Sequence, residues 1–188
     1  MPDPIQMLRE DHEKVKRLFE EFERAEDDEQ RQQIAEAAMR ELEIHSRLEE
    51  EVFYPAVRQS DPEKEADTVN EALEEHHVVD LLINELRSMN GSDEQYKAKF
   101  TVLSENVEHH IEEEETDMLP DARKQIDDLE DVGRRMEQRK AELMREAEQP
   151  QRHNGHRRSS QSRPRTSRSR AGTSKGTKRR PTTHAGRR

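Results

Sequence analysis

Two segments of the sequence each place a histidine and a glutamate at a spacing that suits a metal ion. His45 is followed four residues later by Glu49, and His110 is followed in the same way by Glu114. In both segments a second glutamate comes next, and a proline lies ten residues after the histidine. Residues i and i+4 of an α-helix lie on one face, with Cβ atoms roughly 5–6 Å apart, so an imidazole and a carboxylate can reach a common point. The spacing therefore predicts a ligand pair that occurs twice.

Both ligand pairs lie in the apolar stripe of a predicted helix. Ala38 and Leu42 precede His45 at intervals of three or four residues, the period of a helix face that is turned to a core. The second pair follows an apolar series with the same period: Phe100, Leu103 and Val107. A buried carboxylate without a partner is costly. We therefore expect the glutamate of each pair to have a partner inside the protein.

The helical period predicts four helices in two similar pairs. We expect them at about residues 4–26, 30–57, 62–89 and 92–120. In each pair the first helix has a lone histidine on its apolar stripe. His12 lies 33 residues before His45, and His76 lies 34 residues before the histidine of the second ligand pair. A shift of 64 residues superimposes the apolar positions of the first helix on those of the third, and it selects His76 over His77 as the inward residue.

The composition suits amphipathic helices that each bury one stripe. Only 28% of the residues are hydrophobic and 41% are charged, which favours a helical bundle over a thick layered core. The absence of cysteine excludes disulfides and thiolate ligands. No run approaches the roughly 18 apolar residues of a membrane span, and the first residues lack the basic and apolar regions of a signal peptide. We therefore expect a cytoplasmic protein without membrane contact.

Charge divides the chain into an acidic body and a basic tail. The formal net charge is −11, but residues 151–188 contain 13 Lys and Arg and no Asp or Glu, so the first 150 residues have a net charge of −24. The tail has almost no hydrophobic residues and is predicted to be disordered. The predicted organisation is a four-helix bundle domain at 1–120, a C-terminal helical extension at 121–149 and a disordered, Arg/Ser-rich basic tail at 150–188. The tail could contact nucleic acid or an acidic partner, or it could be a solvated arm.

The order of these residues along the chain resembles a known family. A lone histidine, an HxxxE pair, a second lone histidine and a second HxxxE pair on four helices are similar to the hemerythrin-like HHE cation-binding domain. The resemblance covers about residues 4–120 and implies an all-α, up-and-down four-helix bundle with a non-haem di-iron centre. The metal ligands that the resemblance implies are His12, His45, Glu49, His76, His110 and Glu114.

Four further residues have open roles at the predicted site. Asp80 stands where the family's respiratory oxygen carriers have a further histidine, one turn after the third-helix ligand, and it could be a seventh ligand or orient one. This departure from the family pattern puts stable, reversible oxygen carriage in doubt. Glu50 and Glu115 could accept hydrogen bonds from histidines or face solvent. Tyr54 could donate a hydrogen bond at the site or simply pack.

Six ligands fit a pair of metal ions better than a single ion. Four histidines and two bridging carboxylates would fill about eight of the twelve positions of two octahedral ions, which leaves room for an oxo or hydroxo bridge and an external molecule. Mixed nitrogen and oxygen ligands suit two iron ions, with manganese as an alternative. We therefore expect a metal-binding protein that takes O₂, NO, peroxide or a related small ligand.

The sequence leaves several functions open. The favoured one is a di-iron protein that binds or senses such a ligand, or handles iron, without necessarily turning it over. The alternatives are a di-iron enzyme that acts on peroxide, O₂ or NO, and a sensor bundle that its basic tail tethers to nucleic acid. Two structural interpretations compete with a di-iron site: a bundle that tolerates core histidines, and a ferritin-like bundle, which would need Glu-x-x-His pairs. The oligomeric state stays open.

Overall fold

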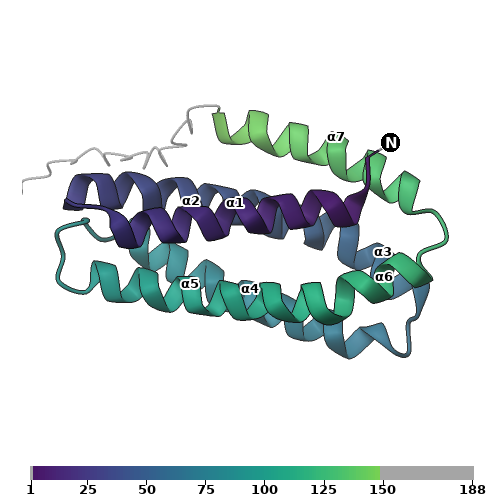
Figure 1. The fold of residues 1–188 in the computed structure, drawn as a ribbon. Coiled ribbons are helices and arrows are strands. Elements are labelled where there is room, and N and C mark those ends of the chain that lie inside the picture. Colours follow the sequence, from purple (N-terminus) through teal and green to yellow (C-terminus); the bar gives the residue numbers. More distant parts are fainter. Residues whose placement is uncertain (1, 149–188) are drawn as a thin grey trace, which may run out of the picture. The chain divides into compact units, whose positions relative to one another are not determined.

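The computed structural model describes residues 2–148, which are helical apart from short connections (Figure 1). The elements are α1 (Pro4–Arg24), α2 (Asp28–Leu48), η1 (Glu49–Phe53), α3 (Tyr54–Ser60), α4 (Glu65–Arg87), α5 (Tyr96–Glu113), η2 (Glu114–Met118), α6 (Leu119–Gln125) and α7 (Leu129–Glu148). No strand occurs among residues 2–148. The predicted all-α bundle with an extra C-terminal helix is therefore confirmed. The tail predicted to be disordered lies outside the described residues.

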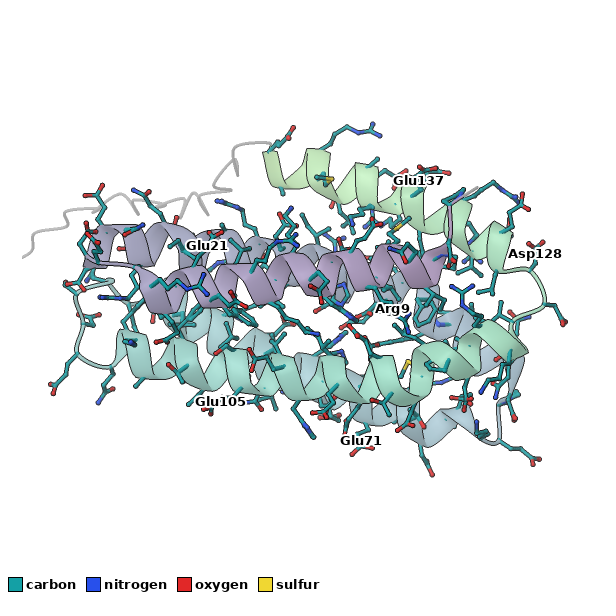
Figure 2. All side chains as sticks on the ribbon, in the orientation of Figure 1. Arg9, Glu21, Glu71, Glu105, Asp128 and Glu137 are labelled. Atoms are coloured by element: carbon teal, nitrogen blue, oxygen red, sulfur yellow. The ribbon has the colours of Figure 1, made fainter. Side chains whose placement is uncertain are left out.

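The helices form a bundle of four rods, and α7 packs against one side of it (Figure 1). The rods are α1, the continuous run α2–η1–α3, α4, and the continuous run α5–η2–α6. Short connections make α1 and α2 neighbours, and likewise α4 and α5. Charged side chains such as Glu21, Glu71 and Glu105 point away from the bundle (Figure 2). None of the helices within residues 2–148 is both long enough and apolar enough to cross a membrane.

The apolar core consists of two clusters, one on each side of a layer of histidines. On α1, Leu8 belongs to one cluster and Val15 to the other, and His12 lies between them. On α4, His76 lies in the same way between Ala72 and Val79. The buried histidines therefore form a layer in the middle of the bundle, and apolar packing continues on both sides of it.

Two helices begin later than predicted because acidic residues form turns before them. The carbonyl oxygen of Asp61 accepts from the backbone N–H of Glu65 at 2.9 Å, and its carboxylate accepts from that of Lys64 at 3.2 Å, so α4 starts at residue 65. Asp93 accepts from Asn90 N–H at 2.8 Å through its carboxylate and from Tyr96 N–H at 2.9 Å through its carbonyl. The predicted start of the fourth helix at residue 92 was therefore wrong.

The second and fourth rods each contain a five-residue π-helical segment that begins at a predicted ligand glutamate. The N–H of Tyr54 bonds the carbonyl of Glu49, five residues earlier, and Leu119 bonds Glu114 in the same way. A proline follows directly in both rods. A proline ring in a regular α-helix clashes with the carbonyl four residues earlier, and a wider turn relieves that clash. Segments of this kind often occur at functional sites.

Helix α7 is held closely against the start of α1 and against η1. Its apolar residues Val132, Met136 and Leu143 are buried in one of the two core clusters. Gly133 approaches the N-terminal segment so closely that an added Cβ would lie 2.1 Å from the carbonyl oxygen of Pro2. The predicted C-terminal helix is therefore an integral part of the folded bundle.

Phe100 gives a test of the cluster farther from α7. Its ring stacks on Phe22 with centroids 3.9 Å apart and meets Phe19 edge-on at 5.8 Å. Phe100→Ala should lower the free energy of unfolding by about 3–5 kcal/mol, because it leaves a cavity in a closed core. Val102→Ala on the same helix, where the side chain is 46% exposed, should change it by at most about 0.5 kcal/mol. Urea unfolding followed by circular dichroism measures both, and equal effects would contradict the packing described.

Candidate metal centre

The six predicted ligands come from six different helical elements and meet in the middle of the bundle. They are His12 on α1, His45 on α2, Glu49 at the start of η1, His76 on α4, His110 on α5 and Glu114 at the start of η2. Each of these residues is 5% exposed or less. The helical spacing and the pairing of the rods thus bring all of them to one buried place.

The ligand atoms fall into two groups that share one carboxylate. The first group consists of His12, His45, Glu49 and Glu114, and the second of Glu49, His76 and His110; within each group the ligand atoms lie within 4.8 Å of one another. A carboxylate that belongs to both groups is placed where it could bridge two ions. The arrangement suits a pair of metal ions better than a single ion.

Each glutamate lies between histidines of two different helix pairs. Glu49 Oε2 is 3.2 Å from His45 Nε2 and 3.4 Å from His76 Nε2. Glu114 has the equivalent position on the fourth rod, where its Oε2 is 3.3 Å from His12 Nε2 and 3.7 Å from Nε2 of the histidine one turn earlier. Both carboxylates therefore link the two halves of the bundle.

Several inward-facing atoms of these residues are buried without a hydrogen-bond partner. They are His12 Nε2, His45 Nε2, Glu49 Oε1 and Glu114 Oε2. Such an atom costs about 1–3 kcal/mol, and native proteins leave few of them. Imidazole nitrogens and carboxylate oxygens are donors that bind iron and manganese. The residues present thus fit a pair of metal ions, which would give these atoms the partner that the protein lacks.

The outer nitrogen of each histidine faces a carboxylate of a neighbouring helix. The Nδ1 atoms pair as follows: His12 with Glu115 at 2.9 Å, His45 with Asp11 at 3.8 Å, His76 with Glu50 at 3.0 Å and His110 with Glu75 at 2.7 Å. A carboxylate in this position keeps the proton on Nδ1, leaves Nε2 free for a metal and raises the basicity of the ring. We call these four groups the outer carboxylates. Three of them form hydrogen bonds that orient His12, His76 and His110, whereas Asp11 faces His45 at a distance too long for a hydrogen bond.

The sequence analysis considered two of the outer carboxylates as partners of the histidines and missed the other two. Glu50 and Glu115 had been left between this role and a solvated one, and the structure places both against histidines. Asp11 and Glu75 were missed because their side chains lie off the apolar stripe. The repeat contains a signal for them, since they are 64 residues apart and each directly precedes a lone histidine.

Comparison with known proteins identifies the family. The model of the hemerythrin HHE cation binding domain matches residues 3–122. The chain belongs to this family. A solved structure of a hemerythrin HHE cation binding domain-containing protein from Mycobacterium kansasii is similar to it, with a TM-score of 0.62, 25% identity, and coverage of 78% of this chain and 92% of that one. A curated DNA nickase of a Nostoc species is 29% identical over 113 residues, which is 60% of this chain but only 31% of that protein.

Tyr54 adds a hydroxyl group to the interior of this HHE domain. The residue is 2% exposed, and its hydroxyl donates to Glu114 Oε1 at 3.0 Å and lies 3.4 Å from Glu49 Oε2. The same oxygen is 3.3 Å from His76 Nε2. Burial and the two neighbouring glutamates raise the pKa of Tyr54 well above its usual value, so the hydroxyl keeps its proton. Of the two roles considered from the sequence, the structure supports both, since Tyr54 packs and also donates within the site.

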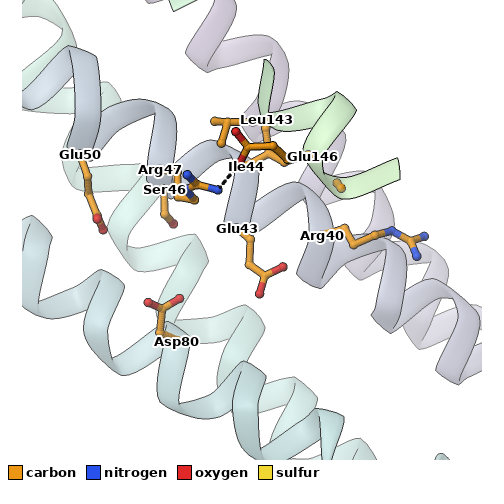
Figure 3. Close-up of a pocket in the computed structure, with 10 residues that line it drawn as sticks. Arg40, Glu43, Ile44, Ser46, Arg47, Glu50, Asp80, Leu143 and Glu146 are labelled. Atoms are coloured by element: carbon orange, nitrogen blue, oxygen red, sulfur yellow. Dashed lines mark hydrogen bonds and ion pairs between the residues drawn. The ribbon is translucent and has the colours of Figure 1, made fainter. Parts of the chain in front are cut away.

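Asp80 belongs to neither ligand group of the HHE domain. It is exposed and lines a surface pocket between α2, α4 and α7 together with Glu43, Glu50 and Arg47 (Figure 3). Partial burial and the neighbouring charge of Glu50 raise the pKa of Asp80. Its suggested role as a seventh ligand therefore finds no support in this arrangement. His77, the neighbour of the inward histidine on α4, is exposed as well.

Without metal, the carboxylates around the site raise the pKa values of His12, His76 and His110. Burial alone would lower the pKa of His76, but contacts with Glu49 and Glu50 outweigh it and raise the pKa to about 10. Burial would raise the pKa of Glu114, but the neighbouring His110 and His12 lower it below its usual range. Metal ions would have to displace these protons, so metal binding and proton release are coupled.

A small apolar cavity adjoins the four histidines of the HHE domain. Its remaining walls are mostly aliphatic: Val15, Leu42, Val79, Val107 and Ile111, with Ser46 beside them. All of its lining residues are buried, and its volume is only about 10 Å³, which is room for about one water-sized molecule. Such walls exclude bulk water and favour a small molecule of low polarity.

The shifted pKa of His76 predicts how the stability of the metal-free protein depends on pH. Because the folded state binds this proton more tightly than the unfolded state, the stabilisation is complete below about pH 6.5 and is lost as the pH rises through about 10. Urea midpoints of the chelator-treated protein between pH 6 and 10 should therefore fall with pH. His76→Gln should flatten this slope and His77→Gln should keep it; an equal slope in all three proteins would contradict the assignment.

Proposed function

We propose that this HHE domain binds two iron ions, which its four buried histidines, Glu49 and Glu114 would hold, and that it binds or senses a small electron-accepting molecule such as O₂, NO or peroxide. The observation that carries the proposal is the shared carboxylate: two ligand groups meet at Glu49, and their four histidines line a small apolar cavity. Manganese is the alternative metal for the same ligands. The location in the cytoplasm stays a prediction.

The residues of the site have distinct parts in this function. When bound, a pair of ferrous ions would supply reducing electrons and open coordination positions. The outer carboxylates hold the histidine rings so that Nε2 faces inward. The aliphatic walls keep water away and admit a small neutral molecule. The Tyr54 hydroxyl has a proton within hydrogen-bond distance of Glu114, and it can donate to an anion that forms beside the carboxylates.

An enzyme that turns over peroxide, O₂ or NO would use the same residues. Tyr54 favours this alternative, because its buried hydroxyl lies beside Glu114 and Glu49 and would donate a hydrogen bond to a reduced product. Steady consumption of peroxide by the metal-loaded protein would favour an enzyme, and stable adducts without consumption would favour a binding or sensing protein.

Metal analysis tests the proposed site directly. Protein purified from its own host should contain two irons per chain and show absorption bands in air that change on anaerobic reduction. Glu49→Gln should lose most of both metals, because Glu49 belongs to both groups and a neutral amide binds iron weakly. Glu105→Gln, an exposed change on α5, should retain them. A folded wild-type protein that refuses iron on anaerobic reconstitution would contradict the proposal.

A second candidate function is attachment of the sensor to nucleic acid through the basic tail. Residues 151–188 contain 13 Lys and Arg and no acidic residue, and a relative of the bundle is named a DNA nickase. The match covers less than a third of that relative, so the nickase activity is not inferred for this chain. Contacts of the tail would be made with phosphates, because the tail contains no aromatic residue to stack on bases.

Truncation tests the role of the tail. The full chain should bind DNA or RNA with an affinity that falls steeply as salt increases, and a chain that ends at Glu148 should lose this binding. A full-length variant with Gln at the Lys and Arg positions of the tail separates charge from length. Fluorescence anisotropy measures all three proteins. Binding that survives the truncation would contradict the second function.

A further inference from the structure

Helix α7 connects to a predicted metal ligand through a short chain of charged groups. Lys140 on α7 donates to Asp11 on α1, and their side chains are only 23% and 12% exposed. The other carboxylate oxygen of Asp11 lies 3.8 Å from His45 Nδ1. Asp11 is the outer carboxylate of His45, so Lys140 pairs with the group that faces this histidine without hydrogen-bonding to it.

Glu75, the equivalent of Asp11 in the other half of the repeat, has no lysine or arginine partner among the described residues. Its carboxylate lies 2.7 Å from His110 Nδ1. The contact of His45 with its outer carboxylate is the longest of the four, at 3.8 Å. The lysine therefore coincides with the weakest outer contact.

A second lysine near an outer carboxylate shows that a nearby cation alone does not lengthen the distance between the carboxylate and its histidine. Lys16 lies 3.6 Å from Glu115, yet Glu115 remains 2.9 Å from His12 Nδ1. The Lys16 side chain is 35% exposed and comes from the same helix as the histidine. Lys140 is more buried and comes from a helix outside the four rods. The position of α7 therefore determines where Lys140 attracts the Asp11 carboxylate.

The position of α7 is itself well determined by packing. Met136 is fully buried, and Gly133 lies against Pro2. Arg139, the neighbour of Lys140, pairs with Glu51 in η1. Helix α7 also lies beyond residues 3–122, which the family model matches. Lys140 is therefore held in place by an element outside the matched domain.

We infer that Lys140 is a positioning residue that makes the two metal positions unequal. By holding Asp11 away from His45 and sharing its charge, Lys140 weakens electron donation by the His45 ring, while Glu75 strengthens donation by His110. An ion held by the stronger donors is stabilised in its oxidised form. The ion at the His12 and His45 position is then the more easily reduced of the two. This inference rests on the proposed di-iron function.

Reduction potentials and iron spectra of the loaded full-length protein test the inference. Lys140→Met should shift the first midpoint potential to a lower value and bring the two Mössbauer signals closer together. Lys140→Arg, which keeps the charge, should stay near the wild type. Arg134→Met removes a charge on α7 that pairs only within the helix, and it should cause no shift. If Lys140→Met does not fold, Lys140→Gln replaces it with the same expectation.

A double variant separates positioning from a simple charge effect. If Lys140 acts through Asp11, Lys140→Met should cause no further shift in an Asp11→Asn background. The same shift in both backgrounds would overturn the inference, and so would a Lys140→Met potential equal to that of Arg134→Met.

A measurement that needs no iron keeps the inference separate from the proposed function. The nitrogen-15 shift of His45 Nδ1 should move in Lys140→Met toward that of a strongly hydrogen-bonded ring. A wild-type protein that takes no iron would refute the proposed function, and the His45 signal would still decide whether Lys140 acts on this ring. An unchanged His45 signal in Lys140→Met would overturn the inference.

Discussion

Two carboxylates buried in a helical core determine how the rest of this structure is built. Glu49 and Glu114 are 0% and 2% exposed, and burial of an uncompensated carboxylate is strongly unfavourable. Four histidines surround them, and the carboxylates raise the pKa values of three of these, His12, His76 and His110; metal ions would displace protons from these rings. The polar groups occupy one layer, and apolar clusters continue on both sides of it. The bundle therefore keeps enough apolar burial to stay folded around a charged centre.

The internal repeat extends beyond the ligands to the groups that orient them. Asp11 and Glu75 contact the histidine of the next helix in their own half, whereas Glu50 and Glu115 contact a histidine of the other half. The π-helical segments recur at the same place in both halves, each followed by a proline. Neither half therefore has a complete set of orienting contacts alone, so formation of the site depends on the packing of the two helix pairs.

The sequence was sufficient to predict the helical bundle and the burial of the six ligand candidates. Residues three or four positions apart lie on one face of a helix, so their spacing shows which side chains point inward. The sequence was insufficient where a feature depends on hydrogen-bond register or on a neighbouring helix. The turn at Asp93 delays α5 through local bonds that the apolar pattern does not express. The π-helical segment η1 directly before Tyr54 was not predicted, because the apolar period does not distinguish it from a regular α-helix. Asp11 lies off the buried stripe, and only the packing of α1 against α2 brings it to its histidine.

A repeat with two similar halves would by itself produce two similar metal positions. In the proposed di-iron function, unequal positions would let one ion change its oxidation state before the other. Helix α7 packs on α1, α2 and η1, all of which belong to the first half. Its Lys140 and Arg139 pair with Asp11 and Glu51 of that half. The repeated helices thus provide the ligands, and the helix that follows them distinguishes one half of the site from the other.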